Sequence, residues 1–161
     1  MPRIDRTTLN QLEQTLHHEI PLSRAMGIQV VRLDAQGLAL SAPLAANINH
    51  KHTAFGGSLA TLATLAGWGL LHLLLHGHPP ATIVIQDSHA RYRRPVTDDF
   101  TAICALPESE ALTTFLQTLI RRGMARIDLT ASIPVGGRPA VEFAGRFVAF
   151  DSTRAPAIGP A

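Results

Sequence analysis

The sequence has a single cysteine, few charged residues and no basic tract. Because Cys104 has no second cysteine with which to form a disulfide, the sequence favours the reducing cytoplasm. The net charge of +2 is small and the arginines do not form a run, so nucleic-acid binding has little support. The polar amino-terminal stretch MPRIDRTTLNQLEQ lacks the apolar core of a secretory signal.

The composition is that of one globular domain. Of the 161 residues, 46% are hydrophobic and 16% are charged, so the chain can bury a sizeable core and general disorder is not expected. No internal repeat is found. We predict a single domain over residues 1–151 and a disordered tail, STRAPAIGPA, over residues 152–161.

The longest apolar run extends from Ser58 to Leu75 and carries no formal charge. This length raises the possibility of a membrane span. Threonines, glycines and a histidine interrupt the run, no lysine or arginine cluster flanks it, and it ends in the loop HGHPP. We therefore favour the central core helix of a soluble protein, with a membrane span as the alternative.

The segments that could enclose such a helix are predicted to be β-strands. The segment ARIDLTASI alternates between apolar and polar residues, as a half-buried strand does. A glycine pair within 135–138 predicts a hairpin turn after it. About six strands are predicted, over residues 27–34, 37–44, 81–96, 99–107, 125–133 and 140–150.

Two amphipathic helices flank these elements. Thr8 with Gln11 forms a plausible capping box for the first helix, and Pro21 ends it. Ser109 can cap the second helix, and Gly123 terminates it. We expect both helices to lie against the sheet edge.

The order of elements, with four strands in antiparallel meander style after the long helix, resembles the hot-dog fold. The resemblance to hot-dog thioesterases is most specific at NHKHTAFGGSLATLATLAGW and SHARYRRPV and covers roughly residues 20–150. The sequence is most similar to the thioesterase-like domain that some bacteria fuse behind an acetyltransferase domain. The resemblance implies an α+β fold in which an antiparallel sheet of about six strands wraps around a long central helix.

The glycine pair at the start of the long helix is the first candidate site. Thioester hydrolysis needs donors for the carbonyl oxygen as it becomes negative, and N–H groups at a helix N-terminus supply them. Gly56 and Gly57 allow the backbone to approach a thioester closely, and the resemblance implies that the N–H of Gly57 is the donor. The alternative is that the glycines only form a tight turn.

The resemblance also implies roles for Asn49 and Thr64. An asparagine six residues before Phe55 is expected to place the attacking water or the thioester, although it could instead cap its own loop. Asn47 fits this spacing less well. Many relatives carry a carboxylate where Thr64 stands and a histidine where Phe55 stands, and a hydroxyl is a poor base near neutral pH.

Asp87 is the candidate general base. It is the only carboxylate within the apolar strand TIVIQDSHARY, where simple alternation gives it the same face as Ile83 and Ile85. An apolar setting of this kind raises a carboxyl pKa. The alternative role is an ion pair with Arg91 or with an arginine across the sheet.

Histidines and arginines complete the expected site. The pairs in HKH and HGH are not joined by a cysteine or carboxylate cluster, so no metal is expected, and His50 or His52 could contact substrate. The arginines around Tyr92 suit phosphates, or else form a solvated strand end. The expected substrate-binding residues are His50, His52, Phe55, Gly56, Ser58, Arg91, Arg93 and Arg94.

The sequence thus predicts a cytoplasmic hydrolase of acyl-coenzyme A or acyl-carrier-protein thioesters that needs no cofactor. Water attacks while Asn49, Gly57, Thr64 and Asp87 form the catalytic set. The alternatives are an acyl-thioester binding module, which the missing helix carboxylate favours, and last a dehydratase. We expect a homodimer joined edge to edge, which can pair into a tetramer.

Overall fold

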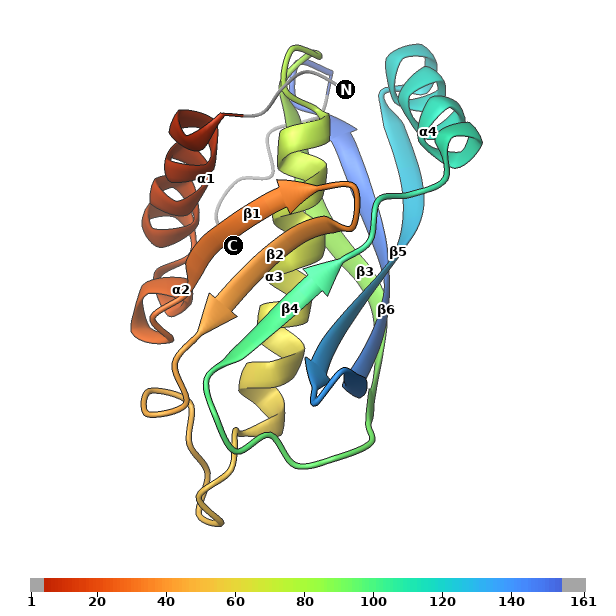
Figure 1. Cartoon of the computed structure of the whole chain (residues 1–161). Helices are drawn as coiled ribbons and strands as arrows, with labels where there is room; N and C mark the ends of the chain where they lie inside the picture. The colour runs from red at the N-terminus through yellow and green to blue at the C-terminus, as the bar shows by residue number, and fades with distance from the viewer. Residues whose placement is uncertain (1–4, 155–161) are drawn as a thin grey trace.

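A six-stranded antiparallel sheet curves around one long helix, α3, in the computed structural model, which describes residues 5–154 (Figure 1). This architecture confirms the predicted α+β fold class. The elements are α1 (Arg6–Glu19), α2 (Pro21–Ala25), β1 (Gln29–Asp34), β2 (Gly37–Ala42), α3 (Gly56–Leu74), β3 (Ala81–Tyr92), β4 (Phe100–Cys104), α4 (Ser109–Arg122), β5 (Met124–Val135) and β6 (Arg138–Asp151).

Helix α3 is the centre of the core. Its leucines and alanines contact β2, β4, β5 and β6, and residues such as Leu62, Leu70 and Leu71 are fully buried. Each buried leucine contributes about 1.5–3 kcal/mol to stability. The helix is long and apolar enough to cross a membrane, but 56% of its most apolar window is buried within this fold. It therefore serves as the core helix here.

The strand order across the sheet is β1-β2-β4-β5-β6-β3. The inward residues of β5, such as Ile127 and Leu129, alternate with exposed ones as predicted. The predicted meander is wrong for β3, which pairs with β6 at the far edge instead of lying beside β4. The chain after β3 must therefore cross the end of the sheet to reach β4 (Figure 1).

The two edge strands differ in how they are covered. Helix α1 packs against β1 and buries Leu9, Leu12 and Leu16. Among residues 5–154, strand β3 pairs only with β6, and none of its residues is buried. An edge strand with a free row of backbone N–H and C=O groups is a template for pairing with another chain.

The caps of the outer helices differ from the prediction. Asp5, not Thr8, is the N-cap of α1, and its carboxylate accepts the N–H of Thr8 at 2.9 Å. Glu108 is the N-cap of α4 and makes no side-chain cap, so Ser109 is already helical. Gly123 ends α4 in the left-handed region, as predicted. Helix α4 packs on β5, an interior strand, rather than on the sheet edge.

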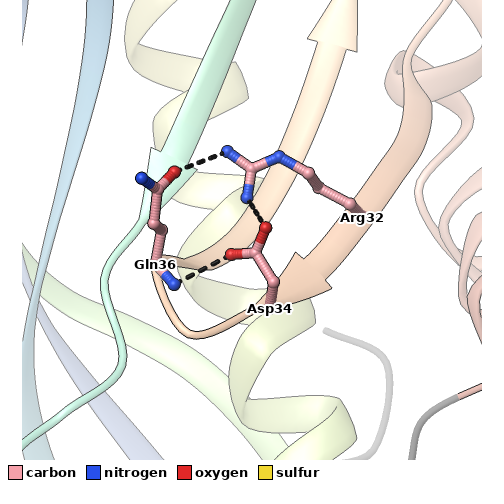
Figure 2. Close-up of polar contacts among 3 residues, drawn as sticks. All are labelled: Arg32, Asp34 and Gln36. Carbon is pink, nitrogen blue, oxygen red and sulfur yellow. Dashed lines mark hydrogen bonds and ion pairs between the residues drawn. The ribbon is translucent and has the colours of Figure 1, made fainter.

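Polar contacts hold the turn between β1 and β2. Figure 2 shows the Arg32 guanidinium reaching both Asp34 and Gln36, whose Oε1 accepts from Arg32 Nη2 at 3.0 Å. The N–H of Gln36 donates to Asp34 Oδ1 at 2.8 Å. The predicted hairpin turn between β5 and β6 is also present, with Gly136 and Gly137 both at positive φ.

The start of the predicted tail is a turn. The N–H of Ser152 donates to the Pro80 carbonyl at 2.8 Å, and the N–H of Thr153 donates to Asp151 Oδ1 at 2.9 Å. Residues 152–154 thus pack against the end of β6. The rest of the predicted tail, residues 155–161, lies outside the described residues.

Close packing of α3 on the sheet predicts the effect of a single methyl group. A Cβ on Gly67 would lie 2.5 Å from Cζ of the fully buried Phe147. Gly67→Ala should lower the free energy of unfolding by about 1–3 kcal/mol through this overpacking. Gly69→Ala is the matched control, since its Cβ would meet only leucine side chains at 3.0 Å and beyond. Denaturant unfolding of both variants checks the difference, and equal stabilities would contradict it.

Candidate active site

The N-terminus of α3 leaves backbone donors free of side-chain caps. Phe55 is the N-cap with an extended backbone (φ −65°, ψ 131°), and its phenyl group cannot accept a hydrogen bond. Its carbonyl accepts the N–H of Leu59 at 3.1 Å. The N–H groups of Gly56, Gly57 and Ser58 precede this first helical bond. They carry the partial positive charge of the helix end, which suits a developing oxyanion.

Phe55 lies over the glycine pair. Phe55 is 57% exposed, and a Cβ on Gly57 would lie 2.3 Å from its ring. Gly57 is itself exposed, while Ser58 and Thr64 are half-buried on α3. Only a residue without a side chain fits under the ring in this position.

The side chain of Asn49 forms its hydrogen bonds within its own loop. Its Oδ1 accepts the N–H groups of Lys51 at 2.8 Å and Thr53 at 3.2 Å, and its Nδ2 donates to Thr53 Oγ1 at 2.9 Å. This matches the loop-capping alternative. The expected water-placing role of Asn49 remains a prediction. His50 and His52 are exposed on the same loop, and His52 has a positive φ of 59°.

Asn47 anchors the loop to the body of the protein. It is buried, and its Nδ2 donates to the carbonyls of Met26 at 2.9 Å and Pro43 at 2.8 Å. Its own carbonyl accepts the N–H of Phe55 at 2.7 Å. Asn47 therefore fixes the position at which α3 begins. Asn47 was the weaker candidate because its distance from the glycines along the sequence does not reveal these long-range contacts.

The segment after β3 passes the start of α3. The Ala54 N–H donates to the Val96 carbonyl at 2.7 Å, and the Tyr92 hydroxyl donates to the Gly56 carbonyl at 3.0 Å. A groove of about 380 Å³ results. Its lining residues are Ala54, Gly56, Leu59, Tyr92, Arg93, Arg94, Pro95 and Val96.

The three arginines near Tyr92 line two different hollows. Arg93 and Arg94 line the groove beside α3, and Arg93 pairs with Glu142 at 2.7 Å. Within residues 5–154 Arg94 forms no ion pair. Arg91 pairs in register with Glu142 and lines a different hollow of about 450 Å³. Arg91 and Arg93 thus both lie at Glu142, and the expected role of Arg91 in substrate binding remains a prediction.

Asp87 lies on the face of the sheet that points away from α3. Its partner in register is Arg146, which lies opposite Asp128 on β5 and binds that carboxylate at 2.7 and 2.8 Å. These side chains are exposed, whereas the next residue of β6, Phe147, is fully buried. Asp87 thus does not share the face of Ile85, which pairs with Phe147. The predicted face of Asp87 is therefore wrong, which argues against its role as general base.

A bulge causes the change of face. The register of β3 on β6 shifts between Ile85 and Asp87, so one residue is inserted and the alternation reverses. Ser88 consequently pairs with Gly145 on the inner face, between the partners of Ile85 and Tyr92. Sequence alternation alone places Ser88 on the outer face, so sequence reasoning missed it.

Two contacts set α3 beside this part of β3. Gly56 lies against Tyr92, and a Cβ on Gly67 would meet Phe147, the partner of Ile85. The helix segment between these glycines, which includes Thr64, therefore runs along the strand segment that includes Ser88. The hydroxyls of Thr64 and Ser88 therefore lie on the same side of the molecule.

The shifted pKa values exclude a cysteine nucleophile. Burial raises the pKa of the Cys104 thiol to about 12, so it stays protonated and unreactive.

Two other side chains have lowered pKa values. Burial, and to a smaller extent the nearby His76, lowers the pKa of His72 at the other end of α3. Hydrogen bonds from Arg146 lower the pKa of Asp128 on the outer face. In the described part of the chain, no group of three or more histidine, cysteine or acidic side chains is arranged so that it could bind a metal ion.

Comparisons with known proteins identify the family and the fold of the chain. Residues 9–151 match a family model described as "Putative thioesterase (yiiD_Cterm)". The chain is 35% identical to the "putative thioesterase" from Shewanella oneidensis, with a TM-score of 0.79 over 88% of this chain and 96% of that one. It is 33% identical to the protein OLEI01261 of Chlorobaculum tepidum, with a TM-score of 0.84 over 89% and 94%.

A more distant structure shares the fold. PA5026 of Pseudomonas aeruginosa is 23% identical over 88% of this chain and 95% of that one, with a TM-score of 0.71. The chain therefore belongs to this thioesterase family and has the hot-dog fold.

The outward position of Asp87 predicts that its carboxylate is dispensable. Asp87→Asn should keep thioester turnover within about twofold of the wild type, because a true general base contributes about 10²–10⁴. Ser88→Ala is the neighbouring comparison on the inner face and should lower turnover further. Steady-state kinetics on one acyl thioester measures both variants. A loss of two orders of magnitude in Asp87→Asn would restore it as the base.

Proposed function

We propose that the protein hydrolyses acyl thioesters of coenzyme A or acyl-carrier protein in the cytoplasm, with the start of α3 as the oxyanion site. The observation that carries the proposal is the uncapped α3 N-terminus, where a glycine pair lies beside a groove lined by Arg93 and Arg94. Family membership supports the thioesterase class, and the free, buried Cys104 is compatible with a reducing compartment.

The proposed reaction is direct attack by water. The thioester carbonyl oxygen accepts the Gly57 N–H, and water adds to the carbonyl carbon to form a tetrahedral intermediate. The C–S bond then breaks, which releases the acid and a thiolate that takes up the proton from water. Thr64 and Ser88 supply hydroxyls that orient the water.

The proton acceptor for this reaction must then come from outside α3. With Asp87 on the outer face, a histidine of the loop before the glycine pair, His50 or His52, is the remaining candidate. Imidazole is the usual general base near neutral pH. The exposure of both rings leaves them free to move toward a bound substrate.

Arginine chemistry supports a carrier with phosphate groups. The guanidinium of Arg94 is exposed at the rim of the groove, and Arg93 beside it is held by Glu142. Guanidinium groups bind phosphate oxygens through paired N–H donors. Both coenzyme A and phosphopantetheine carry such phosphates.

A homodimer is the proposed assembly. The free edge of β3 and its uncovered residues support pairing with the same strand of a second copy, which can in turn pair into a tetramer. Val84, Ile85, Tyr92 and Phe55 are large apolar side chains exposed on this side. Pairing would remove their apolar area from water.

The second candidate function is an acyl-thioester binding module without hydrolysis. It is favoured by the composition of α3, which carries no carboxylate from Gly56 to Leu74. A hydrolysis screen across acyl-coenzyme A chain lengths separates the two functions. Binding without turnover at every length would support the module.

Removal of one backbone donor tests the oxyanion site. Gly57→Pro lacks the N–H at a first-turn position where proline is tolerated, and kcat should fall by about 10²–10³. Gly57→Ala keeps the N–H and should lose much less, since the exposed Phe55 ring can move aside. Circular dichroism checks that both variants fold. Equal activities of the folded variants would eliminate Gly57 as the donor.

The edge-to-edge dimer predicts a difference between the two sheet edges. Ile85→Lys on β3 should weaken association, because it places a charge at the proposed interface. Val31→Lys on β1 is the matched control, since the two side chains are exposed to 37% and 39% in the monomer. Light scattering at micromolar concentration should give a dimer for the wild type and Val31→Lys, and a smaller mass for Ile85→Lys. A monomeric wild type would exclude this assembly.

A further inference from the structure

We infer that Trp68 is the far wall of the acyl site and limits the length of the acyl chain. The inference rests on the proposed function and concerns the side of α3 that faces β3. Trp68 is half-buried, and its Nε1 donates to the Ile83 carbonyl of β3 at 3.3 Å. Its ring stacks on His72 with 5.1 Å between ring centroids. The indole is thus held between the helix and the edge strand.

The surface between the start of α3 and Trp68 is open and made of small side chains. We call it the α3–β3 strip, formed by Ala60, Thr61 and Thr64 of α3 and by Ile85, Ser88 and Ala90 of β3. The helix residues are half-buried, and those of β3 are half-buried or exposed although they lie on its inner face. Within residues 5–154 all six thus keep accessible surface.

The position of the strip identifies its occupant. One end meets the glycine pair, where the thioester carbonyl is proposed to bind, and the other end meets the indole. Its side chains are apolar or bear hydroxyls, and no formal charge lies among them. Such a surface suits the hydrocarbon part of a substrate whose reacting carbonyl sits at Gly57. A second copy of the protein, paired through β3, would cover the strip and enclose the bound acyl chain.

The length of the strip sets the substrate class. Gly57 and Trp68 are about 16 Å apart along the helix axis at 1.5 Å per residue. The indole itself takes up part of this distance. An extended octanoyl chain fits in the remainder, whereas a hexadecanoyl chain does not. The protein therefore takes thioesters of short to medium acyl chains.

The experiment measures chain-length preference with two readouts. One is kcat/KM for octanoyl- and hexadecanoyl-coenzyme A, and the other is the affinity for their non-hydrolysable thioether analogues by calorimetry. Trp68→Ala should raise the hexadecanoyl-to-octanoyl ratio by about tenfold or more, because each buried methylene contributes about fourfold in affinity. Trp68→Leu should give a smaller shift and serves if the alanine variant fails to fold.

Two controls isolate the wall. Trp68→Phe keeps an aromatic ring and should keep the wild-type preference. Leu74→Ala also shortens a large half-buried side chain near the end of α3, but on another side of the helix, and should cause no shift. Thermal unfolding confirms that each variant is folded.

The outcomes separate this inference from the proposed function. An unchanged ratio in folded Trp68→Ala or Trp68→Leu overturns it, as does a wild type that prefers hexadecanoyl chains or binds neither analogue. A different outcome is that the wild type binds the octanoyl analogue without hydrolysing any thioester, and that Trp68→Ala shifts the binding preference. In that case the proposed hydrolase function is wrong, but the role of Trp68 as the wall of the acyl site holds.

Discussion

The burial of α3 is the constraint on which the rest of the structure depends. A helix that is apolar around nearly its whole circumference needs cover on nearly every side. The sheet supplies it by curving, and β3 lies beyond β6 at the far edge. The chain must then return past the start of α3 to reach β4. This return brings Tyr92, Arg93 and Arg94 beside Gly56.

The same helix is left open at its N-terminus at some cost. Asparagine, serine and aspartate are the usual N-caps, and an apolar residue in their place costs about 1 kcal/mol. Here the cap is Phe55, although Asn47 and Asn49 lie only a few residues away. Both asparagines bond to the loop and its surroundings instead. The loop is therefore fixed without consuming the α3 donors, as a binding site for an oxyanion requires.

The sequence was sufficient for the features that depend on local pattern. The alternation in β5, the length of α3 and its start at the glycine pair could all be predicted, because period and composition determine them. The place of β3 could not, because its pairing with β6 joins residues far apart in the chain. The structure therefore confirmed the predicted fold, but it did not bring every predicted site residue to the same site.

The bulge in β3 shows why the site was harder to predict than the fold. One extra residue between Ile85 and Asp87 exchanges the faces of every later side chain in the strand, and no residue type marks it. The carboxylate is thereby turned outward to Arg146, and Ser88 takes the inner position.

This exchange removes the one acid that alternation had assigned to the inner face. The hydroxyls of Thr64 and Ser88 can orient water but are poor proton acceptors. An α3–β3 site without an acid thus depends on the imidazoles of the preceding loop if it hydrolyses, and needs none of them if it only binds. The chemistry of that loop, rather than the fold, decides between the two functions.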